Sequence, residues 1–300
     1  FMAKKKRELS YDINAGGKPI SHRIAKVDKL KWIIMIIALG FVLVTLIISM
    51  FGIIKKSFTN ADGFTLDYYI KIFTEPLYLK VLFNTLKTGV IVTVLCLLLA
   101  YPAAYLSVRA KKPIVRRLIT GGILVPYWIS MLVRIFAWQV ILQSNGIVNQ
   151  MLMGLGITSE PIQILYTDTA VCISMTHILL PYMFLSLQSN MEGIDENLST
   201  AANVMGAKPY RSFLDIFLPL SVPGIFSGSL MVFVLALGFY IAPALLGGAD
   251  NMMMSNLIEQ NMNNFNSNLA AAMSIELLVI VFIIIGIAFK FVGNIFVTKK

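Results

Sequence analysis

Cysteine and histidine are scarce in this chain of 300 residues, which contains two of each. Cys96 and Cys172 both lie inside apolar runs, so we expect small buried side chains and no disulfide framework. The only histidines are His22 and His177. No cysteine or histidine accompanies the methionine run at 252–254, which favours a hydrophobic turn or a contact with the binding protein there over a soft-metal site. The sequence therefore predicts no metal site.

Charge is also scarce, since only 13% of the residues are charged, whereas 57% are hydrophobic and the mean hydropathy is +0.78. A soluble domain of this length cannot keep so much apolar surface away from water, so a lipid bilayer is the expected surrounding. The net charge of +10 does not indicate a nucleic-acid partner, because the basic residues lie beside the apolar segments and fit the positive-inside rule. The first apolar segment is too long for a cleavable signal core, so we expect it to be retained.

Six segments are apolar over roughly the 20 residues that a helix needs to cross the hydrocarbon core. Helices are expected because a lipid-facing backbone must satisfy its own hydrogen bonds. The predicted fold is an all-α membrane protein with six transmembrane helices. The predicted spans are Lys31–Ile54, Val81–Ser107, Leu118–Leu142, Asp168–Gln188, Pro223–Leu246 and Leu269–Phe291.

Lysine and arginine gather on alternate sides of these spans, which predicts the orientation of the chain. They are dense before the first span, after the second and fourth spans, and after the sixth. Both termini and the loop 189–222 are therefore expected in the cytoplasm, although Lys55 and Lys56 lie on the disfavoured side. The predicted organisation is a cytoplasmic tail (1–30), a six-helix domain (31–292) and a second cytoplasmic tail (293–300).

The loop 189–222 has the local signals of two short helices joined at a glycine. Asp195 is a suitable N-cap for a first helix that ends at Met205, and Gly206 can adopt the left-handed conformation that ends a helix. Pro209 suits the first turn of a second helix. That helix is expected to run to about Ile216 and to be stopped by Pro219 and Pro223 before the fifth span.

The same loop resembles the cytoplasmic EAA loop of binding-protein-dependent ABC importers. The pattern is E-A-A, three residues, G, nine residues, I, one residue and L-P. It is matched by Ala201, Ala202, Gly206, Ile216, Leu218 and Pro219, whereas Thr200 stands where glutamate is usual. The resemblance implies that the loop binds an ATPase. The expected coupling residues are Asp195, Thr200, Ala201, Ala202, Gly206, Ala207 and Pro209.

Three further stretches are similar to the permease subunits of spermidine/putrescine-type importers. They lie at residues 132–138 (LVRIFAW), 243–248 (PALLGG) and 62–69 (DGFTLDYY). The resemblance implies that the chain forms half of a translocation pathway in the cell membrane of a bacterium. It also implies that transport works by alternating access. The expected solute is a polyamine or a similar organic cation; phosphonates, sugar acids and iron remain alternatives.

The resemblance also implies partners. They are a second permease subunit, which is expected to be a different chain, two cytoplasmic ATPase subunits, an extracytoplasmic substrate-binding protein and membrane lipids. The chain contains no Gly-x-x-x-x-Gly-Lys-Ser/Thr phosphate loop. We therefore expect no cofactor in this chain and expect ATP and Mg²⁺ to be bound by the partner ATPase.

Three ionisable residues lie well inside the predicted spans, where charge is costly and usually faces a cavity. Lys87, Arg134 and Glu276 are each roughly 10 Å from the outer end of their span at 1.5 Å per residue. The hypothesis is that Glu276 pairs with Arg134 or Lys87, either along the solute pathway or as a structural ion pair. Tyr127 and Tyr240 are candidates for stacking on a cation.

Two other classes of function are alternatives to an importer permease. A membrane-embedded enzyme needs a positioned acid, base, nucleophile or metal ligand. His177 has no carboxylate partner at helical spacing, and Glu276 is the only acid well inside a span, so we expect no enzyme. A sensor that has the permease fold but transports nothing stays open at this stage.

Overall fold

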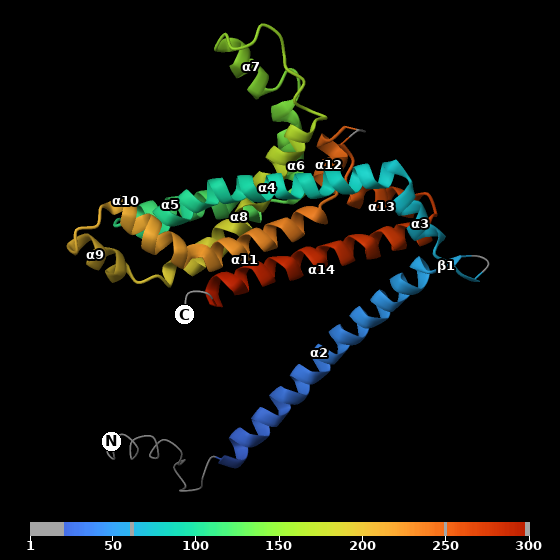
Figure 1. The fold of residues 1–300 in the computed structure, drawn as a ribbon, viewed down its shortest axis with the longest axis horizontal. Coiled ribbons are helices and arrows are strands. Elements are labelled where there is room, and N and C mark those ends of the chain that lie inside the picture. Colours follow the sequence, from blue (N-terminus) through green and yellow to red (C-terminus); the bar gives the residue numbers. More distant parts are fainter. Residues whose placement is uncertain (1–20, 61–62, 249–250, 298–300) are drawn as a thin grey trace. The chain divides into compact units, whose positions relative to one another are not determined.

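The computed structural model describes residues 21–60, 63–248 and 251–297 (Figure 1). The chain divides into two compact units, residues 1–56 and 57–300. In its described part the first unit is helix α2 (Ser21–Ser57), whose last residue falls in the second unit. Its segment Trp32–Ser57 is apolar and long enough to cross a membrane, which confirms the first predicted span. Residues 1–20 and 298–300, which belong to the two predicted tails, lie outside the described residues.

The second unit begins with a small hairpin and a short helix. Strand β1 (Thr59–Asn60) pairs antiparallel with β2 (Gly63–Phe64), and α3 (Asp67–Thr74) follows. Glu75 is extended, so the chain turns there and α4 (Pro76–Arg109) starts with a proline, whose missing N–H costs nothing at this position.

The predicted third span, Leu118–Leu142, is wrong as a continuous helix. Helix α5 (Pro113–Leu124) passes into a 3₁₀ turn, η1 (Val125–Trp128), and a new helix, α6 (Met131–Leu142), begins after two extended residues. Pro126 lies in the 3₁₀ turn and cannot donate a backbone hydrogen bond, which explains the interruption. The segment that qualifies as a span is instead Met131–Gly154, which includes α7 (Ile147–Gly154).

Helices α4, α8 (Asp168–Glu192) and α11 (Leu218–Leu237) lie side by side and enclose the main hydrophobic core (Figure 1). The approach of α8 and α11 is close because α11 presents Gly224 and Gly228 to it. A Cβ atom at Gly224 would lie 2.6 Å from Cβ of Asn190. Small residues four positions apart are the usual means of close helix contact in membranes.

The fifth span also differs from its prediction, Pro223–Leu246. One helical segment runs from Pro209 to Leu237, through α10 (Pro209–Ser212), the π-helical turn η2 (Phe213–Phe217) and α11. The expectation that Pro219 and Pro223 separate a short helix from the span was therefore wrong. The wider π turn directly precedes Pro219 and accommodates the proline, whose ring would otherwise clash with the preceding turn. The segment ends at Gly238, before α12 (Ile241–Leu246).

The last two helices, α13 (Met254–Asn263) and α14 (Ser267–Val297), form a hairpin. They pack with α3 and the start of α4 around a second apolar cluster that includes Ile72, Leu257 and Met273. Among the described residues, six segments are long and apolar enough to cross a membrane. They are Trp32–Ser57, Pro76–Arg109, Met131–Gly154, Asp168–Glu192, Pro209–Leu237 and Ser267–Lys290.

Candidate functional site

Helix α9 (Glu196–Val204) begins at the predicted cap. The backbone N–H of Asn197 donates to Oδ1 of Asp195 at 2.9 Å, and the N–H of Leu198 donates to the Asp195 carbonyl at 3.3 Å. These bonds satisfy donors that a helix start leaves without intrahelical partners. The backbone of Thr200 lies within α9, but its side chain is outside the described residues, so its predicted role stays a prediction.

Helix α9 ends at Val204, and Gly206 makes the left-handed turn that closes it, as predicted. Gly206 has φ +92°, and the N–H of Ala207 donates to the carbonyl of Ala202 at 3.0 Å. This is the six-to-one bond of a Schellman motif, which needs a left-handed residue in the position of Gly206. The chain therefore reverses at Gly206 and leads directly to Pro209, the first residue of α10.

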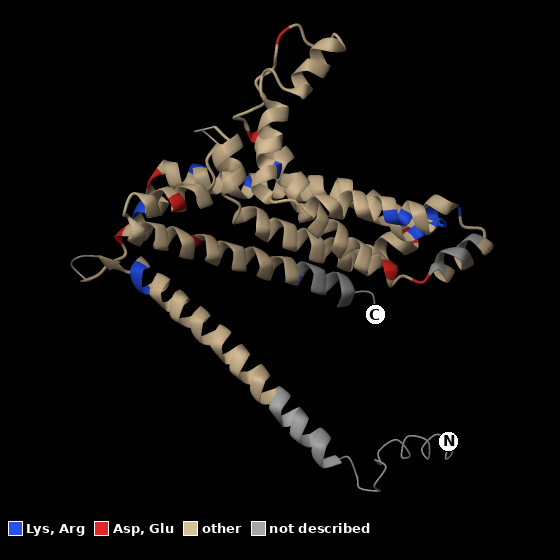
Figure 2. Cartoon of the chain, turned by 180° about the vertical axis from the view of Figure 1, so that it is seen from behind, with Lys and Arg blue, Asp and Glu red and all other residues tan. Residues whose placement is uncertain are grey.

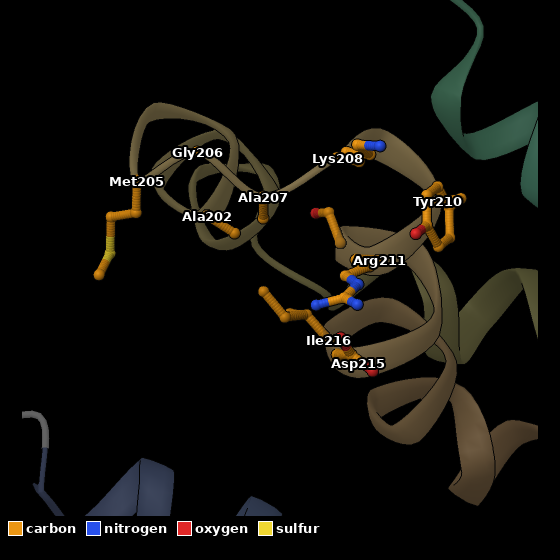
Figure 3. A pocket seen from close by; sticks show the side chains of 10 residues that line it. Ala202, Met205, Gly206, Ala207, Lys208, Tyr210, Arg211, Asp215 and Ile216 are labelled. Atoms are coloured by element: carbon orange, nitrogen blue, oxygen red, sulfur yellow. The ribbon is translucent and has the colours of Figure 1, made fainter.

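A depression of about 590 Å³ lies between the end of α9 and the start of the next helix. The predicted residues Ala202, Gly206 and Ala207 line it together with residues that the sequence reasoning missed. Arg211 extends into the space between the α9 turn and the helix that carries Ile216, whereas Met205 points away from that space (Figure 3). We call this region the coupling surface; its lining residues are Ala202, Met205, Gly206, Ala207, Lys208, Tyr210, Arg211, Ser212, Asp215 and Ile216.

Large apolar side chains are exposed on the coupling surface and next to it, although Tyr210 lies within the membrane-length segment Pro209–Leu237. Met205 is 89% exposed, Val204 83% and Tyr210 56%. Apolar side chains gathered next to a depression are typical of a protein-binding surface. The sequence signal for them was present in the run Val204-Met205-Gly206, which has no polar residue.

Aromatic side chains fix the second half of the coupling segment, by which we mean residues 195–217, against α4. The ring of Tyr105 makes edge contacts with Phe213 and Phe217, with centroids 5.2 and 4.9 Å away. Arg109 lies 5.0 Å over the Phe217 ring. The Tyr101 and Ser221 hydroxyls are 2.9 Å apart. These contacts join residues 213–221 to α4.

An ion pair fixes the end of α8, where the loop that leads to α9 begins. Arg116 of α5 donates to Oε1 of Glu192, which also accepts from Nε2 of Gln188. Figure 2 shows lysine and arginine gathered where α4 ends and α5 begins. Exposed ion pairs of this kind contribute little stability, and their main effect here is on orientation.

The structure contradicts the predicted pairing of Glu276. Lys87 instead pairs with Asp168, with Nζ and Oδ2 3.1 Å apart. Glu276 is 5% exposed and neither of its carboxylate oxygens has a hydrogen-bond partner among the described residues. The sequence predicts how deep each residue lies along its helix. It does not predict which side of the helix the residue occupies, and that side decides which residues pair.

Arg134 lies in a separate groove of about 450 Å³. Its Nε and one terminal nitrogen are buried and have no hydrogen-bond partner in the part of the chain that is described. The predicted Tyr127 lines the groove with Tyr182, and their rings make an edge contact at 5.5 Å. Tyr240 does not line this groove, and its carbonyl accepts from Nδ2 of Asn256 at 2.8 Å. The predicted pathway residues are thus divided among several places.

Residues 96–298 match the family described as the binding-protein-dependent transport system inner membrane component. The chain belongs to this family. It is 34% identical over 261 residues to the spermidine/putrescine transport system permease protein PotB of Salmonella typhimurium (strain SL1344), covering 84% of this chain and 90% of that protein. It is 36% identical over 236 residues to PotB of Escherichia coli (strain K12), covering 76% of this chain and 85% of that protein. The predicted resemblance is confirmed.

Solved structures support the fold. A bacterial alginate ABC transporter, in complex with an alginate pentasaccharide-bound periplasmic protein, matches with a TM-score of 0.72 at 19% identity. The match covers 91% of this chain and 97% of that chain. A chain of the MetNI methionine ABC transporter, in an inward-facing conformation, matches with a TM-score of 0.57 at 16% identity, covering 74% and 98%. The predicted ABC importer permease fold with six membrane helices is confirmed. The family consists of transport components, which agrees with the expectation of a permease that is not an enzyme.

Proposed function

We propose that this permease imports a polyamine across the cytoplasmic membrane of a bacterium, as one subunit of an ATP-driven transporter that works by alternating access. The observation that carries the proposal is the identity of 34–36% to proteins named as spermidine/putrescine permeases over most of the chain. We place both termini and the coupling surface in the cytoplasm, on the distribution of lysine and arginine. The domain limits 1–30, 31–292 and 293–300 follow from that placement.

The coupling surface is proposed to bind one of two cytoplasmic ATPase subunits. Its exposed Met205 and Val204 and the adjacent depression support this role. Asp195 and Gly206 hold α9 in place, and Thr200, Ala201, Ala202, Ala207 and Pro209 complete the contact region. ATP and Mg²⁺ are bound by the ATPase, and this chain holds no cofactor.

The remaining partners are a second permease subunit and an extracytoplasmic binding protein. The groove around Arg134 opens at the surface of this chain and lies beside the broken helix α5–α6. We propose that it faces the solute pathway between the two permease subunits. Non-helical backbone at membrane depth is tolerated only against protein or a water-filled cavity, which supports this placement.

A second candidate function rests on the charge of the groove. Nε and one terminal nitrogen of Arg134 are buried without a hydrogen-bond partner among the described residues, and a guanidinium attracts an anion, so a phosphonate or a sugar acid is the alternative solute. Glu276, whose carboxyl oxygens have no hydrogen-bond partner in the described part of the chain, favours a cation instead. Uptake experiments separate these two solute classes directly.

The test is reconstitution of the full transporter, with its ATPase and binding protein, in proteoliposomes. We expect ATP-dependent accumulation of radiolabelled spermidine or putrescine. We also expect an excess of unlabelled polyamine to compete, whereas phosphonate or glucuronate does not. Uptake of the anions without uptake of polyamines would overturn the proposal and establish the second candidate.

A further inference from the structure

The turn between α4 and α5 presents a cluster of exposed basic side chains (Figure 2). Lys111, Lys112 and Arg117 are exposed and have no ion-pair partner among the described residues. The sequence has no aspartate or glutamate anywhere in residues 76–159, so neighbouring residues of the chain supply no compensating charge. The turn therefore presents three positive charges to its surroundings.

An exposed apolar stripe begins directly after this turn. It consists of Ile114, Leu118, Gly122 and Val125, whose spacing of four, four and three residues places them on one face of a helix. Ile114 is 54% exposed, Leu118 68% and Val125 63%. Nothing lies within 4 Å of a Cβ atom at Gly122, so the surface is open there too. We call these four residues the α5 stripe.

The α5 stripe runs from the basic turn back along α4. The hydroxyl oxygens of Ser107 and Thr120 lie 3.1 Å apart, so α5 packs beside the end of the membrane-length segment Pro76–Arg109. From Ile114 to Val125 a helix rises by about 17 Å at 1.5 Å per residue. That length is roughly half of the hydrocarbon core of a bilayer. The stripe therefore extends about as far as the acyl chains of one leaflet.

We propose that the α4–α5 turn and the α5 stripe bind a phospholipid with a net negative headgroup in the cytoplasmic leaflet. Lys111, Lys112 and Arg117 donate charge-assisted hydrogen bonds to the headgroup phosphate, and one acyl chain lies along the stripe. A zwitterionic phospholipid has the same chains but no net charge, so it binds more weakly. The proposal goes beyond the proposed function and shares with it only the placement of this turn in the cytoplasm.

The combination of charge and apolar surface favours a lipid over a protein partner. The side chains change from basic to apolar between Lys112 and Ile114, and a phospholipid makes the same change from phosphate to hydrocarbon. A cytoplasmic ATPase would contact the turn but would leave the stripe uncovered. A second permease subunit would cover the stripe but would leave the charges unused. Either protein contact is an outcome of the test.

The test is photocrosslinking of the assembled transporter, with its ATPase and partner permease, in phosphatidylcholine nanodiscs. The probe is phosphatidylglycerol with a diazirine in one acyl chain, and phosphatidylcholine with the same diazirine chain is the comparison. Mass spectrometry of the digested protein locates the crosslinks. We expect the phosphatidylglycerol probe to label residues 118–125 more strongly than the phosphatidylcholine probe. We also expect unlabelled phosphatidylglycerol to compete with it.

The variant that removes the three charges combines Lys111→Gln, Lys112→Gln and Arg117→Gln. The fraction of phosphatidylglycerol that gives half-maximal labelling should rise by about 5-fold for each basic side chain removed. The matched control combines Lys111→Arg, Lys112→Arg and Arg117→Lys, which keeps the charge and should label as the native protein does. ATP-dependent uptake by both variants checks that they insert and assemble.

Equal labelling of residues 118–125 by the two probes overturns the site, and so does strong labelling that the charge-removing variant retains. Absence of labelling in the assembled transporter shows that another subunit covers the stripe, which also overturns the proposal. If phosphatidylglycerol labels the stripe but proteoliposomes accumulate no polyamine, the lipid site stands and the proposed function fails. If uptake is normal and the labelling is absent, the proposed function stands and the lipid site fails.

Discussion

The hydroxyl oxygens of Tyr101 and Ser221 lie 2.9 Å apart, although 120 positions separate the two residues in the chain. The contact joins α4 to α11 directly after the π turn that continues from the coupling surface. The Tyr101 ring also makes an edge contact with Phe213, at 6.2 Å. The junction between the coupling segment and the membrane helices is therefore held by polar and aromatic contacts together.

Tyr101→Phe should lower the free energy of unfolding by about 1 kcal/mol, because it removes a hydrogen bond but keeps the ring contact. Tyr105→Phe is the control: its ring packs on Phe213 and Phe217, but its hydroxyl has no hydrogen bond among the described residues. Thermal unfolding of the purified transporter measures both variants. An equal loss in the two variants would show that the Tyr101–Ser221 bond contributes nothing of its own.

Gly206→Val should weaken binding of the ATPase, because φ +92° costs an L-residue about 1–2 kcal/mol and a β-branched residue more. The measurement is co-purification of the ATPase together with ATP hydrolysis stimulated by the loaded binding protein. Gly193→Ala, in the same loop, is the control because Gly193 has φ −79°. Normal coupling in Gly206→Val would contradict the role of the Schellman turn.

Glu276→Leu should make the isolated permease more stable and make transport slower. The substitution removes two buried carboxylate oxygens that have no partner among the described residues, and an unpaired buried charge is destabilising. Transport should fall if the carboxylate is retained for the solute pathway. Met273→Leu, in the apolar cluster of α14, controls for repacking. A less stable Glu276→Leu protein would indicate that Glu276 has a structural partner.

Gly224→Ala should destabilise the permease by about 1–3 kcal/mol, the usual cost of overpacking. The new methyl group would lie 2.6 Å from Cβ of Asn190, so α8 and α11 must separate. Gly286→Ala is the matched control, because nothing lies within 4 Å of a Cβ atom at that glycine. Both proteins are compared by thermal unfolding in the same detergent, and equal stabilities would contradict the close approach of the two helices.

The features that the sequence predicted correctly are local ones. Asp195 and Gly206 act on backbone groups a few residues away, so capping rules were sufficient to place α9. The spans within α2, α4, α8 and α14 were found because a long apolar run has few alternatives in a membrane protein.

The features that the sequence missed depend on contacts between distant segments. Pro219 and Pro223 are helix-breaking signals in isolation, but a π turn and the aromatic contacts with α4 keep the helix continuous. Lys87 and Asp168 are 81 positions apart, and their pairing depends on how α4 and α8 are rotated.

The π turn at Phe213–Phe217 also affects how a movement of the coupling surface is transmitted to the membrane helices. A turn of this kind holds one residue more than an α-helical turn, and each residue of an α-helix corresponds to about 100° of rotation. If the turn tightened to α-geometry, α10 would swivel about the helix axis relative to α11 instead of only sliding along it. A rotation at the coupling surface would then pass through the π turn to the membrane helix α11.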